Sequence, residues 1–224
     1  MKKRVIFSFT LILFLVFAMS GNVVEAGFSM STPHGQIVPY SGVSYNSLNM
    51  EKLEGLFVET YAEIDKVDET DSTPGFYLGA NHWFKDKLSD YGAGFEYEEL
   101  IAIKYDRPNV ELENRSLFLT GSYRLSGIKE SLPEYIYFTT GIGVSQAVLT
   151  WKDDEVLEAD YDKPVYDGES FIGPALKIGV QGSYTVYKNV KLGGRANYRY
   201  ARPHSEGDLD INGFELGAQV EIKF

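Results

Sequence analysis

Few residues of this chain are suited to catalysis. The sequence contains three histidines, His34, His82 and His204, and no cysteine. His204 is followed by Ser205 and Glu206, which are the residue types of a hydrolytic triad. Three consecutive residues cannot easily form the line of nucleophile, base and orienting acid that catalysis requires, and a polar loop has the same composition. We therefore expect no catalytic site, and therefore no enzyme.

Metal binding has little more support. No pair of histidines has the spacing of metal ligands and there is no thiolate, so we expect no zinc site and no cofactor. One acidic stretch, in the segment 152–169, offers oxygen ligands for Ca²⁺ or Mg²⁺. Its carboxylates are Asp153, Asp154, Glu155, Glu158, Asp160, Asp162, Asp167 and Glu169. The stretch lacks the Asp-x-Asp-x-Asp-Gly order of an EF-hand, which favours a solvated loop and no metal site.

The charge balance excludes another class of partner. The chain has 32 acidic and 21 basic residues and a formal net charge of −11. Phosphates would be repelled by such a protein, so we expect no nucleic acid partner.

The amino terminus reads as an export signal. The basic residues Lys2–Arg4 precede an apolar stretch, Val5–Met19, and Val24-Glu25-Ala26 places a small residue at a cleavage position before Gly27. The alternative is an uncleaved anchor, but the apolar stretch is shorter than the roughly 20 residues that a spanning helix needs. We expect residues 1–26 to be a signal peptide and residues 27–52 to be a periplasmic lead segment.

The last eleven residues show the pattern that decides the architecture. Every second residue back from Phe224 is apolar, and none of the residues between them is large and apolar. Side chains of a strand point alternately to two faces, so this segment has one apolar and one polar face. The apolar face consists of Phe214, Leu216, Ala218, Val220, Ile222 and Phe224.

The same alternation runs through six segments upstream. They are Gly75–Phe84, Tyr91–Tyr105, Arg115–Leu125, Tyr135–Trp151, Phe171–Tyr187 and Val190–Arg202. A closed single-chain barrel needs an even number of strands, and Leu53–Lys66 is the candidate for the eighth. A helix is the alternative there, because Leu53, Phe57, Tyr61 and Ile64 also lie on one helical stripe.

This pattern, ending in an apolar-face Phe224, resembles the small eight-stranded bacterial outer-membrane barrels, the group of the OmpA transmembrane domain, OmpX and OmpW. The resemblance implies an all-β, closed, antiparallel, up-and-down transmembrane β-barrel over residues 53–224. It also implies a monomer in the outer membrane, in contact with outer-membrane lipid. Phe224 would then be the signal through which the barrel-assembly machinery recognises the C-terminal strand.

The polar face carries charges of both signs. In an outer-membrane barrel these side chains point into a narrow lumen and can pair there. The predicted lumen network consists of Glu96, Glu98, Arg124, Lys177, Arg195, Arg199, Glu215 and Glu221. A soluble, lipocalin-like barrel that binds an apolar ligand is the alternative, with an apolar interior and a polar exterior.

One residue conflicts with the predicted faces. Glu99 falls on the apolar phase, while Leu100 points to the lumen. A β-bulge near Glu98-Glu99 would exchange the two faces beyond this point and remove the conflict.

These expectations define the function only broadly. Eight strands leave room for little more than side chains, so a plugged lumen is expected. The roles that remain are structural support, surface interaction and slow passage of small solutes. A lipid-modifying enzyme is a less favoured alternative, because no motif supports it.

Overall fold

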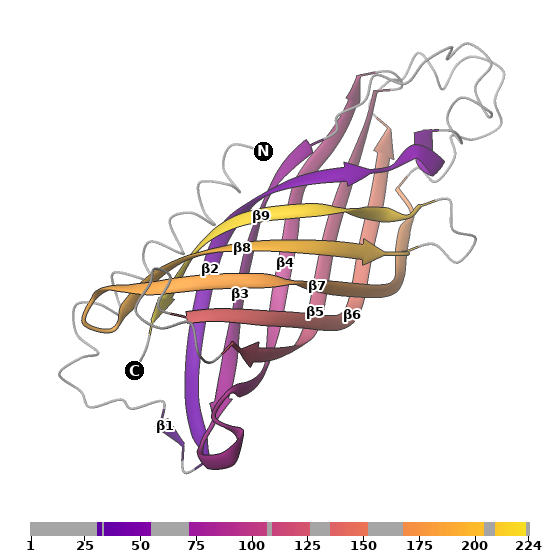
Figure 1. Ribbon diagram of the computed structural model, residues 1–224. Coiled ribbons are helices and arrows are strands. Elements are labelled where there is room, and N and C mark those ends of the chain that lie inside the picture. The colour runs from indigo at the N-terminus through magenta and orange to yellow at the C-terminus, as the bar shows by residue number, and fades with distance from the viewer. Residues whose placement is uncertain are drawn as a thin grey trace, which may run out of the picture.

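A computed structural model describes residues 31–32, 34–54, 72–106, 109–125, 135–151, 168–203 and 209–222. Within these residues, eight antiparallel strands, β2 to β9, pair each with its neighbour in sequence, and β9 pairs with β2 to close the barrel (Figure 1). The strands are β2 (Gly35–Asn49), β3 (Ser72–Phe84), β4 (Tyr91–Asp106), β5 (Asn109–Arg124), β6 (Tyr135–Trp151), β7 (Ser170–Tyr187), β8 (Val190–Ala201) and β9 (Ile211–Ile222). The predicted closed, all-β, up-and-down barrel is confirmed.

The two ends of the barrel differ in their connections. At one end lie the start of β2, the end of β9, the 3-10 turn η1 (Asp86–Leu88) between β3 and β4, and the turn Lys188-Asn189 between β7 and β8. Lys188 has φ 38°, in the left-handed region that a tight hairpin turn requires. The short strand β1 (Ser31–Thr32) pairs with the start of β2 at this end. The two longest connections between barrel strands, residues 50–71 and 152–169, join strands at the opposite end. Outer-membrane barrels have their longer loops outside, so we take that end as the outer one.

The first strand of the barrel is not where the sequence predicted it. β2 pairs with both β3 and β9, so the barrel begins at Gly35, inside the segment expected to be a lead. Residues 51–54 form a helical turn, so the strand expected over Leu53–Lys66 is wrong at its start, and residues 55–66 lie outside the described residues. The sequence of β2 does not show the apolar–polar alternation clearly, because Pro39, Ser41 and Ser47 stand at outward positions where apolar residues are expected.

The predicted bulge exists on β4, but it lies beyond Leu100, later in the strand than expected. The register between β4 and β5 shifts between Leu100 and Ile103, not at Glu98-Glu99. Glu99 therefore stays on the outer face, where Tyr97 donates a hydrogen bond to it over 2.8 Å. Leu100 stays in the lumen, where it is buried.

No helix among the described residues is long and apolar enough to cross a membrane. No group of three or more histidine, aspartate or glutamate side chains in this part of the chain is placed to hold a metal ion.

Candidate functional site

The outer surface of the barrel is apolar over most of its height. Large apolar side chains point outward from all eight strands, and Leu119, Phe214 and Ile172 are each about two-thirds exposed, at 68%, 66% and 66%. Such a continuous belt is far larger than soluble monomers expose, and it requires an apolar surrounding. At the height of this belt the lumen is polar, so the lipocalin-like alternative is wrong.

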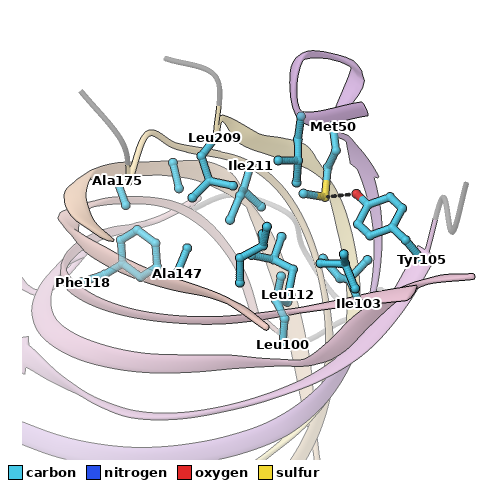
Figure 2. Close-up of a cluster of buried hydrophobic side chains, with 14 residues drawn as sticks. Met50, Leu100, Ile103, Tyr105, Leu112, Phe118, Ala147, Ala175, Leu209 and Ile211 are labelled. Atoms are coloured by element: carbon cyan, nitrogen blue, oxygen red, sulfur yellow. Dashed lines mark hydrogen bonds between the residues drawn. The ribbon is translucent and has the colours of Figure 1, made fainter. Parts of the chain in front are cut away.

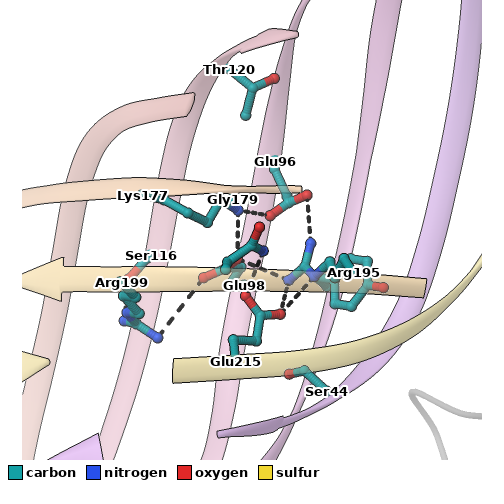
Figure 3. Close-up of polar contacts among 12 residues, drawn as sticks. Ser44, Glu96, Glu98, Ser116, Thr120, Lys177, Gly179, Arg195, Arg199 and Glu215 are labelled. Carbon is teal, nitrogen blue, oxygen red and sulfur yellow. Dashed lines mark hydrogen bonds and ion pairs between the residues drawn. The ribbon is translucent and has the colours of Figure 1, made fainter. Parts of the chain in front are cut away.

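Charged side chains fill the lumen at mid-height. Arg195 of β8 donates to Glu96 of β4 over 2.8 Å, to Glu98 over 3.0 Å, and to Glu215 of β9 through Nε over 2.6 Å (Figure 3). Lys177 of β7 donates to Glu98 over 2.6 Å and also to Glu96. Four strands thereby meet across the barrel axis. We call these five residues, together with Arg199, the central charge layer.

Arg199 extends this layer toward the outer end. Its guanidinium donates to Ser116 over 2.7 Å and to the Asn114 side-chain oxygen, and lies 3.9 Å from Glu98. Asn114 and Ser116 are on β5, so Arg199 connects the layer to a fifth strand. The layer then contains three cations and three carboxylates, all at most 5% exposed at the side chain. Balanced charge is what makes such burial tolerable, because an unpaired buried ion costs several kcal/mol.

Aromatic rings fill the space between the charges. The Arg195 guanidinium lies 3.1 Å from the ring centroid of Tyr77, and Lys177 Nζ lies 4.6 Å from that of Phe118. A Cβ atom at Gly42 would lie 2.3 Å from the Tyr77 hydroxyl, so the ring fits only because residue 42 has no side chain. The lumen at this height is therefore packed with side chains.

An apolar plug closes the lumen between the central charge layer and the outer end (Figure 2). Tyr105 donates a hydrogen bond to the sulfur of Met50 over 3.3 Å, which links β4 to the end of β2. The plug consists of the buried side chains of Met50, Leu53, Leu100, Ile103, Tyr105, Val110, Leu112, Phe118, Ala147, Leu149, Ala175, Ala201, Leu209 and Ile211. Sequence reasoning missed this plug. Its signal was present, because Val110 and Leu112 share the lumen phase with Asn114.

The outer face beside the plug is charged. Arg115 of β5 lies 3.4 Å from Glu99 and 3.3 Å from Glu113, and Lys104 lies 3.0 Å from Glu111. On the same side, Gln146 of β6 donates to Ser170 of β7 over 2.7 Å.

The alternation therefore reverses along β4 and β5. Below Glu99 and Arg115 the barrel is polar inside and apolar outside, as suits lipid. Beyond them, β4 and β5 turn apolar side chains inward and charged side chains outward, as suits water. We call this water-adapted part the outer extension.

The predicted lumen residues separate into two groups. Glu96, Glu98, Lys177, Arg195, Arg199 and Glu215 meet in the central charge layer. Arg124 and Glu221 instead line a pocket at the periplasmic end. Phe224, His204 and the acidic residues 153–167 lie outside the described residues, so their roles remain predictions.

Comparison with solved structures identifies the fold. One similar structure is that of Ail, the attachment invasion locus protein of Yersinia pestis, in complex with the heparin analogue sucrose octasulfate. It matches with a TM-score of 0.51 and 13% identity, over 84% of this chain and 99% of that chain. Neisserial surface protein A matches with a TM-score of 0.50 and 16% identity over 84% of this chain and 97% of that one. The chain has the fold of the small outer-membrane β-barrels. The apolar belt agrees with this fold and with the outer-membrane location expected from the sequence.

Sequence comparison adds no relative. The sequence matches no protein-family model, and a search of curated proteins finds no significant match. At 13% and 16% identity the structural matches establish the fold and leave the function to be argued from the site.

Proposed function

We propose that this protein is a non-enzymatic, monomeric outer-membrane barrel with a closed lumen, which acts by holding its outer extension at the cell surface. The observation that carries this proposal is the reversal of the alternation beyond Glu99 and Arg115. A barrel built only to cross the membrane has no need of an apolar interior beyond the lipid. An apolar interior there stabilises a folded, water-exposed structure that can meet a partner.

Closure of the lumen supports a surface role over solute passage. A solute would have to cross both the central charge layer and the apolar plug, which lie one above the other. Opening the first would separate buried ion pairs, and opening the second would expose fully buried leucines.

The net charge of the chain indicates which kind of partner it can bind. Ail binds a sulfated heparin analogue, as its structure shows. A formal net charge of −11 disfavours a polyanionic ligand of that kind here. A cationic or neutral surface partner fits this chain better.

Single-cysteine labelling tests the surface display directly, because the chain has no cysteine of its own. Lys104→Cys places a thiol on the exposed face of the outer extension, and Lys188→Cys places one in the turn at the opposite end. A membrane-impermeant maleimide should label Lys104→Cys on intact cells and should label Lys188→Cys only after the outer membrane is opened. Equal labelling of both on intact cells, or the reverse order, would refute the proposed orientation.

A further inference from the structure

A pocket opens at the periplasmic end of the lumen, on the far side of the central charge layer from the plug. Its volume is about 220 Å³. The closed lumen makes it a dead-end cavity reached from the periplasm. Its chemistry is set by three apolar lining residues, Val38, Trp83 and Tyr137, and by four charged ones, Lys85, Arg124, Lys191 and Glu221.

One wall of the pocket consists of two aromatic rings and a guanidinium. The rings of Trp83 and Tyr137 lie 4.9 Å apart, and the Arg124 guanidinium lies 4.7 Å from the Trp83 ring and 6.0 Å from the Tyr137 ring. Trp83, Tyr137 and Val38 are buried together, so this wall is apolar and closely packed. A guanidinium held against an aromatic ring can still offer its N–H groups to a planar carboxylate.

The charges of the lining favour an anion. Lys85, Arg124 and Lys191 are cationic, and Glu221 is the one carboxylate among the lining residues. Glu221 lies directly opposite Lys191 in the register of β8 and β9, so it offsets one of the three cations. It also accepts hydrogen bonds from Gln219 over 2.7 Å and from Ser183 over 3.5 Å. Lys85 also donates to the Thr32 carbonyl over 3.0 Å at the exposed rim. The pocket thus has a net positive charge in a strongly acidic chain.

We propose that this pocket binds a small anion that carries an aromatic or other apolar group, with a carboxylate as the anionic part. The carboxylate faces Arg124 and Lys191, and the apolar group packs against Trp83, Tyr137 and Val38. The ligand enters from the periplasm and does not pass through the barrel.

Fluorine NMR can report on this pocket alone. The sequence has two tryptophans, Trp83 and Trp151, so Trp151→Phe protein labelled with 5-fluorotryptophan carries a single fluorine signal at the pocket. The purified full-length mature protein in detergent micelles is titrated with benzoate. Benzamide and benzylamine are the neutral and cationic probes of the same shape.

Benzoate should shift the Trp83 signal saturably, and benzamide and benzylamine should bind at least about tenfold more weakly, because only benzoate has a negative charge to pair with the cations of the pocket. Arg124→Gln should weaken benzoate binding by a similar factor. Lys191→Gln is the second variant in case Arg124→Gln fails to fold. Lys188→Gln, at the same end but outside the pocket lining, is the control and should bind as the parent does.

Three results would overturn the proposal. The first is the lack of any saturable shift with benzoate. The second is benzamide binding as tightly as benzoate, which would indicate an apolar cleft without anion preference. The third is unchanged benzoate affinity in every folded pocket variant.

Discussion

Arg195→Gln should destabilise the barrel strongly, because this residue holds the central charge layer together. Its side chain is fully buried and it contacts all three carboxylates of the layer, Glu96, Glu98 and Glu215. Without it, three buried carboxylates face two cations, Lys177 and Arg199. Removing one partner from a buried ion pair costs about 3–5 kcal/mol, mostly through the charge left without compensation.

Charge balance, and not the loss of contacts alone, should dominate that cost. Arg195→Gln combined with Glu215→Gln restores two carboxylates against two cations. The double variant should therefore be more stable than the sum of the single changes predicts, by roughly 0.5–3 kcal/mol. Lys104→Gln breaks the ion pair with Glu111 on the outer extension, where Lys104 is 54% exposed, and should cost about 0–1 kcal/mol.

Guanidinium unfolding in detergent micelles, followed by tryptophan fluorescence, measures these differences. Five proteins are compared: the parent, Arg195→Gln, Glu215→Gln, the double variant and Lys104→Gln. A loss for Arg195→Gln as small as that for Lys104→Gln would refute the reasoning. Strict additivity in the double variant would show that charge balance is not the cause.

Two further predictions concern the plug and the lipid boundary. Leu149→Ala removes a fully buried side chain of the plug and should cost about 2–5 kcal/mol of unfolding free energy. The control, Leu119→Ala on the lipid face, leaves no internal cavity and should cost less in the same unfolding assay. Equal losses would contradict a packed plug. Leu119→Arg places a charge within the apolar belt and should cost about 2–4 kcal/mol in a lipid bilayer. Glu113→Arg lies beyond the boundary at Arg115 and should cost about 0–1 kcal/mol. If unfolding in vesicles shows a larger cost for Glu113→Arg than for Leu119→Arg, the lipid boundary lies elsewhere.

The alternation of single strands predicted much of this molecule. Seven of the strands, the closed barrel and the inward direction of Glu96, Arg195 and Glu215 follow from the two-residue period, because a barrel in lipid must separate polar and apolar faces strand by strand. The period fails at β2, where outward positions are filled by Pro39 and two serines. A short apolar run at Leu53 then looked like the better strand, although Leu53 instead packs into the plug.

The alternation of single strands could not predict features that depend on several strands at once. Which carboxylate meets Arg195 depends on the stagger of β4, β8 and β9 around the barrel. Arg124 and Glu221 share the polar phase with the central charge layer, but their height along the strands places them in the periplasmic pocket. In the plug, the positions that face the lumen change from polar to apolar residues beyond Arg115. A rule that assigns polar residues to the lumen along a whole strand misses this change.

Planar-bilayer recording of the purified monomer is the most direct measurement of lumen closure. With the central charge layer and the plug both in place, the protein should insert and show no stable stepwise conductance above the detergent-only control. Reproducible steps of large, stable conductance from the monomer would contradict a closed lumen, and with it the surface role proposed for this barrel.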